Sequence, residues 1–293
     1  MTTVLITGAG GFIARHLAQT LADAGVRVLG ASRSGVASPT YARVFTARLG
    51  ETLLPALASE PVDALVHTAL ADGADAYHVN VEGTSRWMDE ARAAGVGLQV
   101  FLSTLSAEEG ALSDYGRAKW TLQERFVDAG EVVFRLGVVV GDGGMYARIR
   151  SSVTRAPVVP MLDGGRQLLY VAGIETVCAV LRDAITSDGD GLRGAVWNLV
   201  QPEPVTLRAM VTAINRQAGR RALLVPLPAS PVLAALQVAE SVPMLRLPVT
   251  STNVRGLIQQ GQRRFPSDYE RFGYPVQPLE ELIAAVGQMT RLS

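Results

Sequence analysis

The first seventeen residues, MTTVLITGAGGFIARHL, constrain the fold of this chain more than any other stretch. Val4, Leu5 and Ile6 form a short apolar run typical of a strand buried on both faces, and the glycine-rich run 7–11 ends it. From Phe12 the apolar residues take up helical spacing. A strand that turns through glycines into a helix leaves the free N–H groups of that helix, and the positive end of its dipole, facing a space that a phosphate can fill.

The spacing of Gly8, Gly11 and Ala14 fits a dinucleotide-binding turn. Glycine is needed there because a Cβ would keep the backbone away from a pyrophosphate, and a small residue one turn into the helix lets helix and strand touch. An ordinary tight turn is the alternative for a glycine motif taken alone. We expect cofactor contacts from Thr7, Gly8, Gly10, Gly11, Phe12 and Ile13.

Strand-like and helical runs alternate through the first two hundred residues, which predicts a parallel sheet covered by helices on both faces. The predicted strands are 3–7, 26–32, 42–46, 63–68, 98–103, 132–136 and 195–199. The predicted helices are 11–24, 51–59, 74–94, 114–129, 173–186 and 206–218. The sequence therefore predicts an α/β fold with a Rossmann-type, doubly wound parallel sheet.

After Gly137 the regular alternation of strand-like and helical runs gives way to loop-like segments, which predicts a second lobe. Segments 142–144 and 157–165 are loop-like, and prolines interrupt short helices from Gln201 onward. We predict an NAD(P)-binding domain from residues 1–140 plus about 171–200, and a smaller, mostly helical substrate lobe from about 141–170 plus 201–293. The ligand crevice is expected between the lobes, at the carboxyl ends of the strands.

The composition disfavours several classes of function. Lys+Arg and Asp+Glu both number 27, so the formal net charge is zero and no excess of positive charge favours binding to nucleic acid or to a membrane. The single cysteine, Cys178, is expected to be a small buried hydrophobe, and the three histidines lack metal-ligand spacing, so no metal is expected. The chain shows no positively charged leader and no stretch of eighteen apolar residues, which favours a soluble cytoplasmic protein.

The end of the second predicted strand indicates the form of the cofactor. In this kind of site a carboxylate there binds the ribose 2′-hydroxyl of NAD, whereas a basic residue pairs with the 2′-phosphate of NADP. The chain has no carboxylate at this place and offers Arg33, with a forked guanidinium, and Ser32, with a hydroxyl. NADP is therefore favoured over NAD, the alternative being a solvated loop arginine.

Tyr115 and Lys119 lie four residues apart at the start of a predicted helix, which places them on one face. A phenol has an ordinary pKa of about 10, and a nearby ammonium is expected to lower it toward neutrality. The strand before this helix ends in two hydroxyls, Ser103 and Thr104, where a third catalytic group is needed. A surface pair is the alternative for a tyrosine and lysine at this spacing alone; the order of strand, hydroxyl and helix favours catalysis.

Taken together, these motifs make the chain resemble the extended or atypical short-chain dehydrogenases/reductases of the NAD-dependent epimerase/dehydratase branch. The resemblance is carried by runs 7–14, 63–69, 80–84, 103–104, 115–119, 134–141, 197–200 and 272–275. It implies that Tyr115 is the general acid/base, that Lys119 binds the nicotinamide ribose and tunes Tyr115, and that Thr104 hydrogen-bonds the substrate oxygen.

The resemblance also implies supporting roles. Asn80 would hold its helix and the neighbouring strand, and Leu136 and Val138 would lie beside the nicotinamide. Further cofactor contacts are expected from His67, Thr68, Ala69, Asn80 and Ser103, although a packed core histidine is equally compatible with His67. Arg166 has the spacing of a diphosphate-binding arginine, with a surface ion pair as the alternative.

Three functions remain open. Leu105 and Ser106 stand where related dehydratases carry an Asp-Glu pair, so dehydration is disfavoured. The leading hypothesis is NADPH-dependent reduction of a ketone, a keto-sugar nucleotide or a more apolar carbonyl compound, by Thr104, Tyr115 and Lys119. A redox-neutral nucleotide-sugar epimerase with bound NAD is the second, and a non-catalytic NADP-sensing protein the third. The resemblance allows a homodimer.

Overall fold

The computed structural model describes residues 2–35, 38–73, 75–240 and 263–292 and divides into two compact units. Unit 1 consists of Met1–Gly110, Asp114–Leu136 and Ile174–Leu199. Unit 2 consists of Ala111–Ser113, Gly137–Gly173 and Val200–Ser293. Residues 241–262 of the predicted substrate lobe lie outside the described part of the chain.

Unit 1 is built on a seven-stranded sheet with the order β11-β6-β5-β4-β1-β2-β3, and every neighbouring pair in it is parallel. The strands are β1 (Thr3–Thr7), β2 (Arg27–Ser32), β3 (Arg43–Thr46), β4 (Ala64–His67), β5 (Leu98–Thr104), β6 (Val132–Leu136) and β11 (Ala195–Leu199). The strand order reverses between β1 and β4, where doubly wound sheets bind ligands. The predicted Rossmann-type sheet is confirmed.

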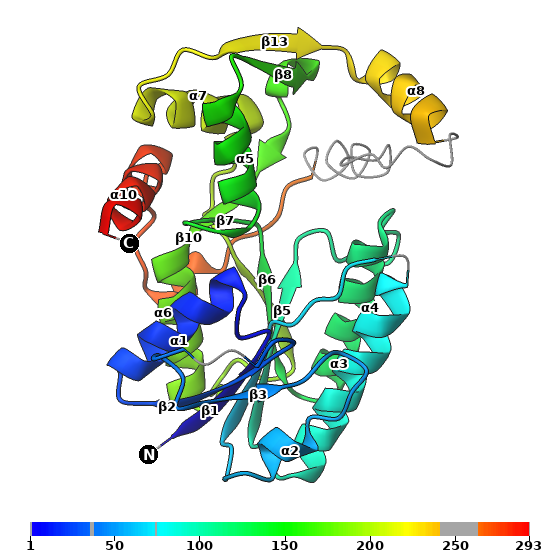
Figure 1. Ribbon diagram of the computed structural model, residues 1–293, viewed down its shortest axis with the longest axis vertical. Helices are drawn as coiled ribbons and strands as arrows, with labels where there is room; N and C mark the ends of the chain where they lie inside the picture. The colour runs from blue at the N-terminus through cyan, green and yellow to red at the C-terminus, as the bar shows by residue number, and fades with distance from the viewer. Residues whose placement is uncertain (1, 36–37, 74, 241–262, 293) are drawn as a thin grey trace. The chain divides into compact units, whose positions relative to one another are not determined.

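Helices cover both faces of this sheet (Figure 1). They are α1 (Phe12–Asp23), α2 (Leu54–Leu57), α3 (Ala76–Ala93), α4 (Asp114–Asp128) and α6 (Ile174–Thr186). Helix α1 packs beside α6 and α3 packs beside α4, and the two pairs lie on opposite faces. Each predicted helix of this unit is present, although the predicted helix 51–59 shortens to the single turn α2.

Local sequence pattern explains why these elements form. All five residues of β1 are buried, as its apolar run predicts for a strand with helices on both sides. In α1 the buried residues are Ala14, Leu17, Ala18 and Leu21, which is the spacing of one helical face. Cys178 is buried in α6, as predicted.

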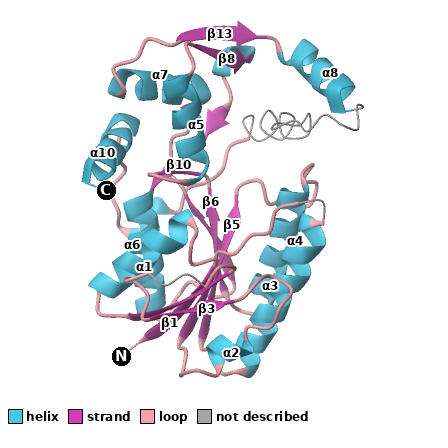
Figure 2. Ribbon diagram, viewed as in Figure 1, coloured by secondary structure: helices cyan, strands magenta, loops and turns pink. Residues whose placement is uncertain are grey.

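Unit 2 mixes short strands with helices (Figure 2). Its two-stranded sheets are β10-β7, β12-β9 and β13-β8. The strands are β7 (Val138–Val140), β8 (Val158–Leu162), β9 (Leu168–Leu169), β10 (Val171–Gly173), β12 (Val205–Thr206) and β13 (Leu223–Leu227). The helices are α5 (Gly144–Arg155), α7 (Leu207–Gln217), α8 (Ala229–Glu240) and α10 (Leu279–Leu292), with 3-10 turns at Asp163–Gly165 and Tyr269–Phe272.

The prediction that segment 157–165 is a loop is wrong, because it contains β8. This strand carries Pro160 and, among the described strands, pairs with β13 alone, whose residues follow more than sixty positions later. A short strand held by so distant a partner has little local pattern to reveal it. Side chains of α5, α7 and α10 form the core of unit 2 around Tyr146, Met210 and Ile283.

No helix in the described ranges is both long and apolar enough to span a membrane.

Candidate active site

The turn after β1 requires glycine at position 8. Gly8 has φ +67°, and a Cβ there would lie 2.9 Å from Ala69 Cα and 3.0 Å from Ala69 N. The turn is closed by the Gly11 N–H, which donates to the Gly8 carbonyl at 2.7 Å. Backbone conformation and lack of space therefore both exclude a side chain at this position.

The N-terminus of α1 fits a dinucleotide pyrophosphate. Its N-cap is Gly11, which provides no side-chain cap, and its first turn holds no acidic residue. The N–H groups at the start of the helix are therefore left to an anion, which the helix dipole also favours. A Cβ at Gly10 would meet nothing within 4 Å, so open space lies beside the turn.

The carboxyl ends of β1 and β4 are joined through threonine side chains. The buried Thr7 hydroxyl accepts the N–H groups of Thr68 at 3.2 Å and Ala69 at 3.3 Å. The Thr68 hydroxyl donates in turn to the Thr7 carbonyl. These bonds hold the two strand ends together at the point where the strand order reverses.

The end of β2 presents the predicted NADP-selecting pair. Ser32 accepts a hydrogen bond from the Gly35 N–H at 3.2 Å, which closes a tight turn. Arg33 is exposed, and among the residues that the structure describes none forms a hydrogen bond or ion pair with its guanidinium. Its forked donors are thus available to an anionic group.

Sequence reasoning missed Tyr41, which braces the glycine turn. Its buried hydroxyl shares its one proton between the carbonyls of Ala9 at 2.9 Å and Ala14 at 3.1 Å. Its ring lies so close to Gly30 that a Cβ there would be 3.0 Å from Tyr41 Cδ1. A glycine inside a strand is the signal that could have found this contact, since it marks a close approach.

Thr104, Tyr115 and Lys119 come together where β5 ends and α4 begins. The Tyr115 hydroxyl interacts with the Thr104 side chain, which favours the ionised phenol and so lowers its pKa. Lys119, one helical turn further, is 8% exposed, and its Nζ donates to the Leu102 carbonyl at 2.6 Å. The same ammonium lies 4.5 Å from the centre of the Phe101 ring, a cation–π contact.

Burial controls the protonation of Lys119 and Tyr115. It lowers the pKa of Lys119 to about 8, so the side chain remains largely cationic at neutral pH. Although 44% of Tyr115 is exposed, burial of its hydroxyl raises the pKa above 10, and the bond with Thr104 opposes this only in part. The expectation that the pKa of Tyr115 is lowered is wrong for the protein alone, because burial raises it. Tyr115 therefore carries its proton, the form that an acid catalyst needs.

Three predicted cofactor residues are bonded to the protein itself. Asn80 bonds the N–H and carbonyl of Ala71 and thereby fixes the connection between β4 and α3. The buried Ser103 hydroxyl donates to Gln123 at 3.2 Å. His67 is 2% exposed and its Nε2 lies 2.9 Å from Gln99 Oε1. The roles of all three toward a cofactor remain predictions.

His67 should make the stability of the protein depend on pH. Burial lowers its pKa from 6.5 to about 4, so between these values the unfolded chain binds more protons than the folded one. The free energy of unfolding should therefore fall by about 3 kcal/mol as the pH drops from 6.5 to 4. In urea titrations across this range, His67→Gln should remove that part of the pH dependence and His78→Gln, at an exposed site on α3, should keep it. Parallel curves for His67→Gln and the wild type would contradict the assignment.

Leu136, Val138 and Arg166 are divided between the units. Leu136 ends β6 in unit 1 and its carbonyl accepts the Leu105 N–H at 3.1 Å. Val138 begins β7 in unit 2 and is buried. Arg166 follows the 3-10 turn of unit 2 with its side chain exposed, and no described residue pairs with it.

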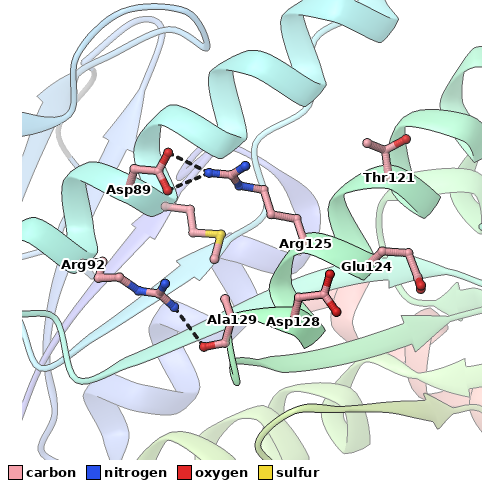
Figure 3. Close-up of a pocket in the computed structure, with 8 residues that line it drawn as sticks. Asp89, Arg92, Thr121, Glu124, Arg125, Asp128 and Ala129 are labelled. Atoms are coloured by element: carbon pink, nitrogen blue, oxygen red, sulfur yellow. Dashed lines mark hydrogen bonds and ion pairs between the residues drawn. The ribbon is translucent and has the colours of Figure 1, made fainter.

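A surface pocket of about 510 Å³ lies between α3 and α4, away from the predicted site residues. Across it Arg125 donates to both carboxylate oxygens of Asp89 at 2.8 Å, and Arg92 bonds the Ala129 carbonyl at 2.9 Å (Figure 3). The pocket is lined by Met88, Asp89, Arg92, Thr121, Glu124, Arg125, Asp128 and Ala129. Both arginines of the pocket are thus already bonded, one to a carboxylate and one to the backbone. We assign no chemistry to this pocket.

Comparison with known proteins gives one curated relative and several solved structures with the same fold. A curated relative, the ceramide reductase of Caulobacter vibrioides, is 29% identical over 171 residues, which cover 55% of this chain and 54% of the relative. The match thus spans about half the length of that protein.

Two solved structures share the fold. The crystal structure of gox2253 superposes with a TM-score of 0.76 at 20% identity, covering 100% of this chain and 98% of that one. The UDP-glucose 4-epimerase of Thermotoga maritima, solved with UDP-glucose, superposes with a TM-score of 0.74 at 16% identity, covering 99% of each chain.

The family model of the NAD dependent epimerase/dehydratase family matches residues 4–129, which include the glycine turn, Thr104, Tyr115 and Lys119. Through this segment, which is less than half of the chain, the protein is similar to the NAD-dependent epimerase/dehydratase family.

Proposed function

We propose that this enzyme reduces a ketone with NADPH. The observation that carries the proposal is the grouping of Thr104 at the end of β5 with a protonated Tyr115 and the cationic Lys119 in the first turns of α4. This is the protonation state for delivering a proton to a carbonyl oxygen. The name of the ceramide reductase relative supports reduction over isomerisation.

The chemistry divides between cofactor and protein. Bound NADPH would supply a hydride to the carbonyl carbon. Tyr115 donates its hydroxyl proton to the carbonyl oxygen, and Thr104 donates a hydrogen bond to the same oxygen as negative charge develops there. Lys119 supplies positive charge that stabilises the phenolate left on Tyr115. The product is an alcohol, and a solvent proton restores Tyr115.

The NADPH preference rests on the end of β2. Arg33 is exposed and is not engaged by the described residues, and Ser32 adds a hydroxyl beside it. A 2′-phosphate would accept hydrogen bonds from both side chains, whereas a 2′-hydroxyl would lack the carboxylate partner that NAD sites offer.

A second candidate is a redox-neutral nucleotide-sugar epimerase with bound NAD. The exposed Arg166 favours it, because a guanidinium that no described residue pairs with could bind a diphosphate. A non-catalytic NADP sensor is less well supported, since it has no need of the buried Lys119. A cytoplasmic location and a homodimer remain predictions.

The test is a panel of carbonyl compounds with NADPH or NADH as reductant. The panel should include long-chain keto-lipids, small ketones and keto-sugar nucleotides. We expect NADPH absorbance to fall with at least one compound. If Ser32 and Arg33 favour NADPH over NADH by about 1.4 kcal/mol or more, kcat/KM should be roughly tenfold or more higher with NADPH than with NADH. NAD in the purified protein, with isomerisation of a nucleotide sugar at constant absorbance, would instead establish the epimerase.

A further inference from the structure

The chain turns sharply after Thr104 and returns onto its hydroxyl. The Ala107 N–H donates to the Thr104 carbonyl at 3.0 Å, which closes a four-residue turn. Within it the Ser106 hydroxyl lies 3.2 Å from Thr104 Oγ1, and the Ser106 N–H donates to the same oxygen at 3.4 Å. Leu105, 2% exposed and bonded through its N–H to the Leu136 carbonyl at 3.1 Å, fixes the turn against the sheet.

The number of protons available restricts the direction of these bonds. A hydroxyl has one proton to donate and two lone pairs to accept with. If the N–H and the hydroxyl of Ser106 both donate to Thr104, both lone pairs are used. Thr104 then cannot accept from Tyr115 and can only donate its one proton, to the Tyr115 oxygen in the free protein and to the carbonyl oxygen once substrate is bound. The proton of Tyr115 is left free to face a carbonyl oxygen.

Suppose instead that Thr104 donated its proton to the Ser106 hydroxyl. The Ser106 N–H would still use one lone pair of the Thr104 oxygen, and the second lone pair would accept the proton of Tyr115. The acid would then be held by the protein, and Thr104 would have no donor left for the substrate. The two arrangements differ only in the direction of the bond between the two hydroxyls, so a residue that fixes this direction would control the acid.

We propose that Ser106 is a positioning residue that donates to Thr104 and thereby directs the protons of Thr104 and Tyr115 toward the reacting oxygen. This inference deepens the proposed ketone reduction and rests on it for its catalytic meaning. Distances of 3.2 and 3.4 Å are long for such bonds, and catalytic hydrogen bonds commonly shorten when substrate binds.

Ser106 is suited to a test because it is only half-buried in a turn. Replacing it with alanine removes one hydroxyl and leaves the backbone N–H in place. We expect Ser106→Ala to fold with nearly wild-type stability. If it does not fold, Ser106→Cys retains nearly the same shape with a much weaker donor and should show the same effects to a smaller degree.

The experiment measures the titration of Tyr115 without cofactor or substrate. The protein is labelled with 3-fluorotyrosine, whose fluorine lowers the phenol pKa into a range where the chain stays folded. The Tyr115 ¹⁹F resonance is identified by its loss in Tyr115→Phe. In Ser106→Ala the neutral phenol can donate to Thr104, so the pKa of Tyr115 should rise by roughly half a unit to one unit. Ser106→Thr should restore the wild-type titration.

Turnover provides the second readout, with a carbonyl compound that the wild type reduces. Ser106→Ala should lower kcat about tenfold with little change in KM, since the lost bond acts mainly in the transition state. The control is Ser59→Ala, which removes a serine hydroxyl bonded to the Ala56 carbonyl at 2.7 Å, remote from Thr104 in the chain.

A wild-type Tyr115 titration in Ser106→Ala would overturn the proposal, whatever the turnover of that variant. Failure of the wild type to reduce any carbonyl compound would instead overturn the proposed function. The two failures are distinguishable because the titration requires neither NADPH nor substrate.

Discussion

Tyr115→Phe is expected to bind NADPH as tightly as the wild type and to reduce carbonyl compounds roughly a thousandfold more slowly, which is within the range for loss of a general acid. The change removes one hydroxyl, the group that interacts with the Thr104 side chain. Because the side chain is 44% exposed, its loss leaves no cavity and should not disturb packing. Fluorescence titration with NADPH measures binding, and single-turnover absorbance measures hydride transfer.

The matched control for this experiment is Tyr77→Phe on α3. Tyr77 also has a hydroxyl bonded to a threonine, Thr121 at 3.3 Å, and has no part in the proposed site. Its loss should change neither binding nor turnover. Wild-type turnover in Tyr115→Phe would eliminate the acid role and with it the proposed mechanism.

The sheet of unit 1 was predictable because its information is local. Each strand is a short apolar run ended by glycine or polar residues, as in β1 and β5, and each helix shows a one-sided apolar pattern, as in α1. Alternation of the two then allows few arrangements other than a parallel sheet. The parts of unit 2 that escaped prediction, such as β8, depend on partners far along the chain.

The residues proposed for the site were chosen from local patterns as well, and their roles remain predictions. Glycine spacing and the four-residue spacing of Tyr115 and Lys119 are local properties of the sequence. The bracing of the turn by Tyr41 depends on contacts between distant segments, so no local pattern shows it. The burial that raises the pKa of Tyr115 and lowers that of Lys119 likewise depends on packing, and this is why the sign of the Tyr115 shift was wrongly predicted.

Gly8→Ala is expected to destabilise unit 1 by about 2–4 kcal/mol and to weaken NADPH binding at least tenfold. A residue with a side chain at φ +67° is strained, and the new Cβ would lie 2.9 Å from Ala69 Cα, a backbone atom at the end of β4 that cannot move independently. The turn or the strand must shift, and either movement would displace the N–H groups at the start of α1. Chemical denaturation measures the first effect and fluorescence titration the second.

Gly10→Ala is the internal control for the stability measurement, because its Cβ would enter open space and its φ is not positive. Gly10 belongs to the proposed nucleotide turn, so only the free energy of unfolding is compared. That quantity should stay within about 0.5 kcal/mol of the wild type. If Gly8→Ala were equally harmless, neither the strain at Gly8 nor its approach to Ala69 would limit this turn, and the glycine there would be required by the ligand alone.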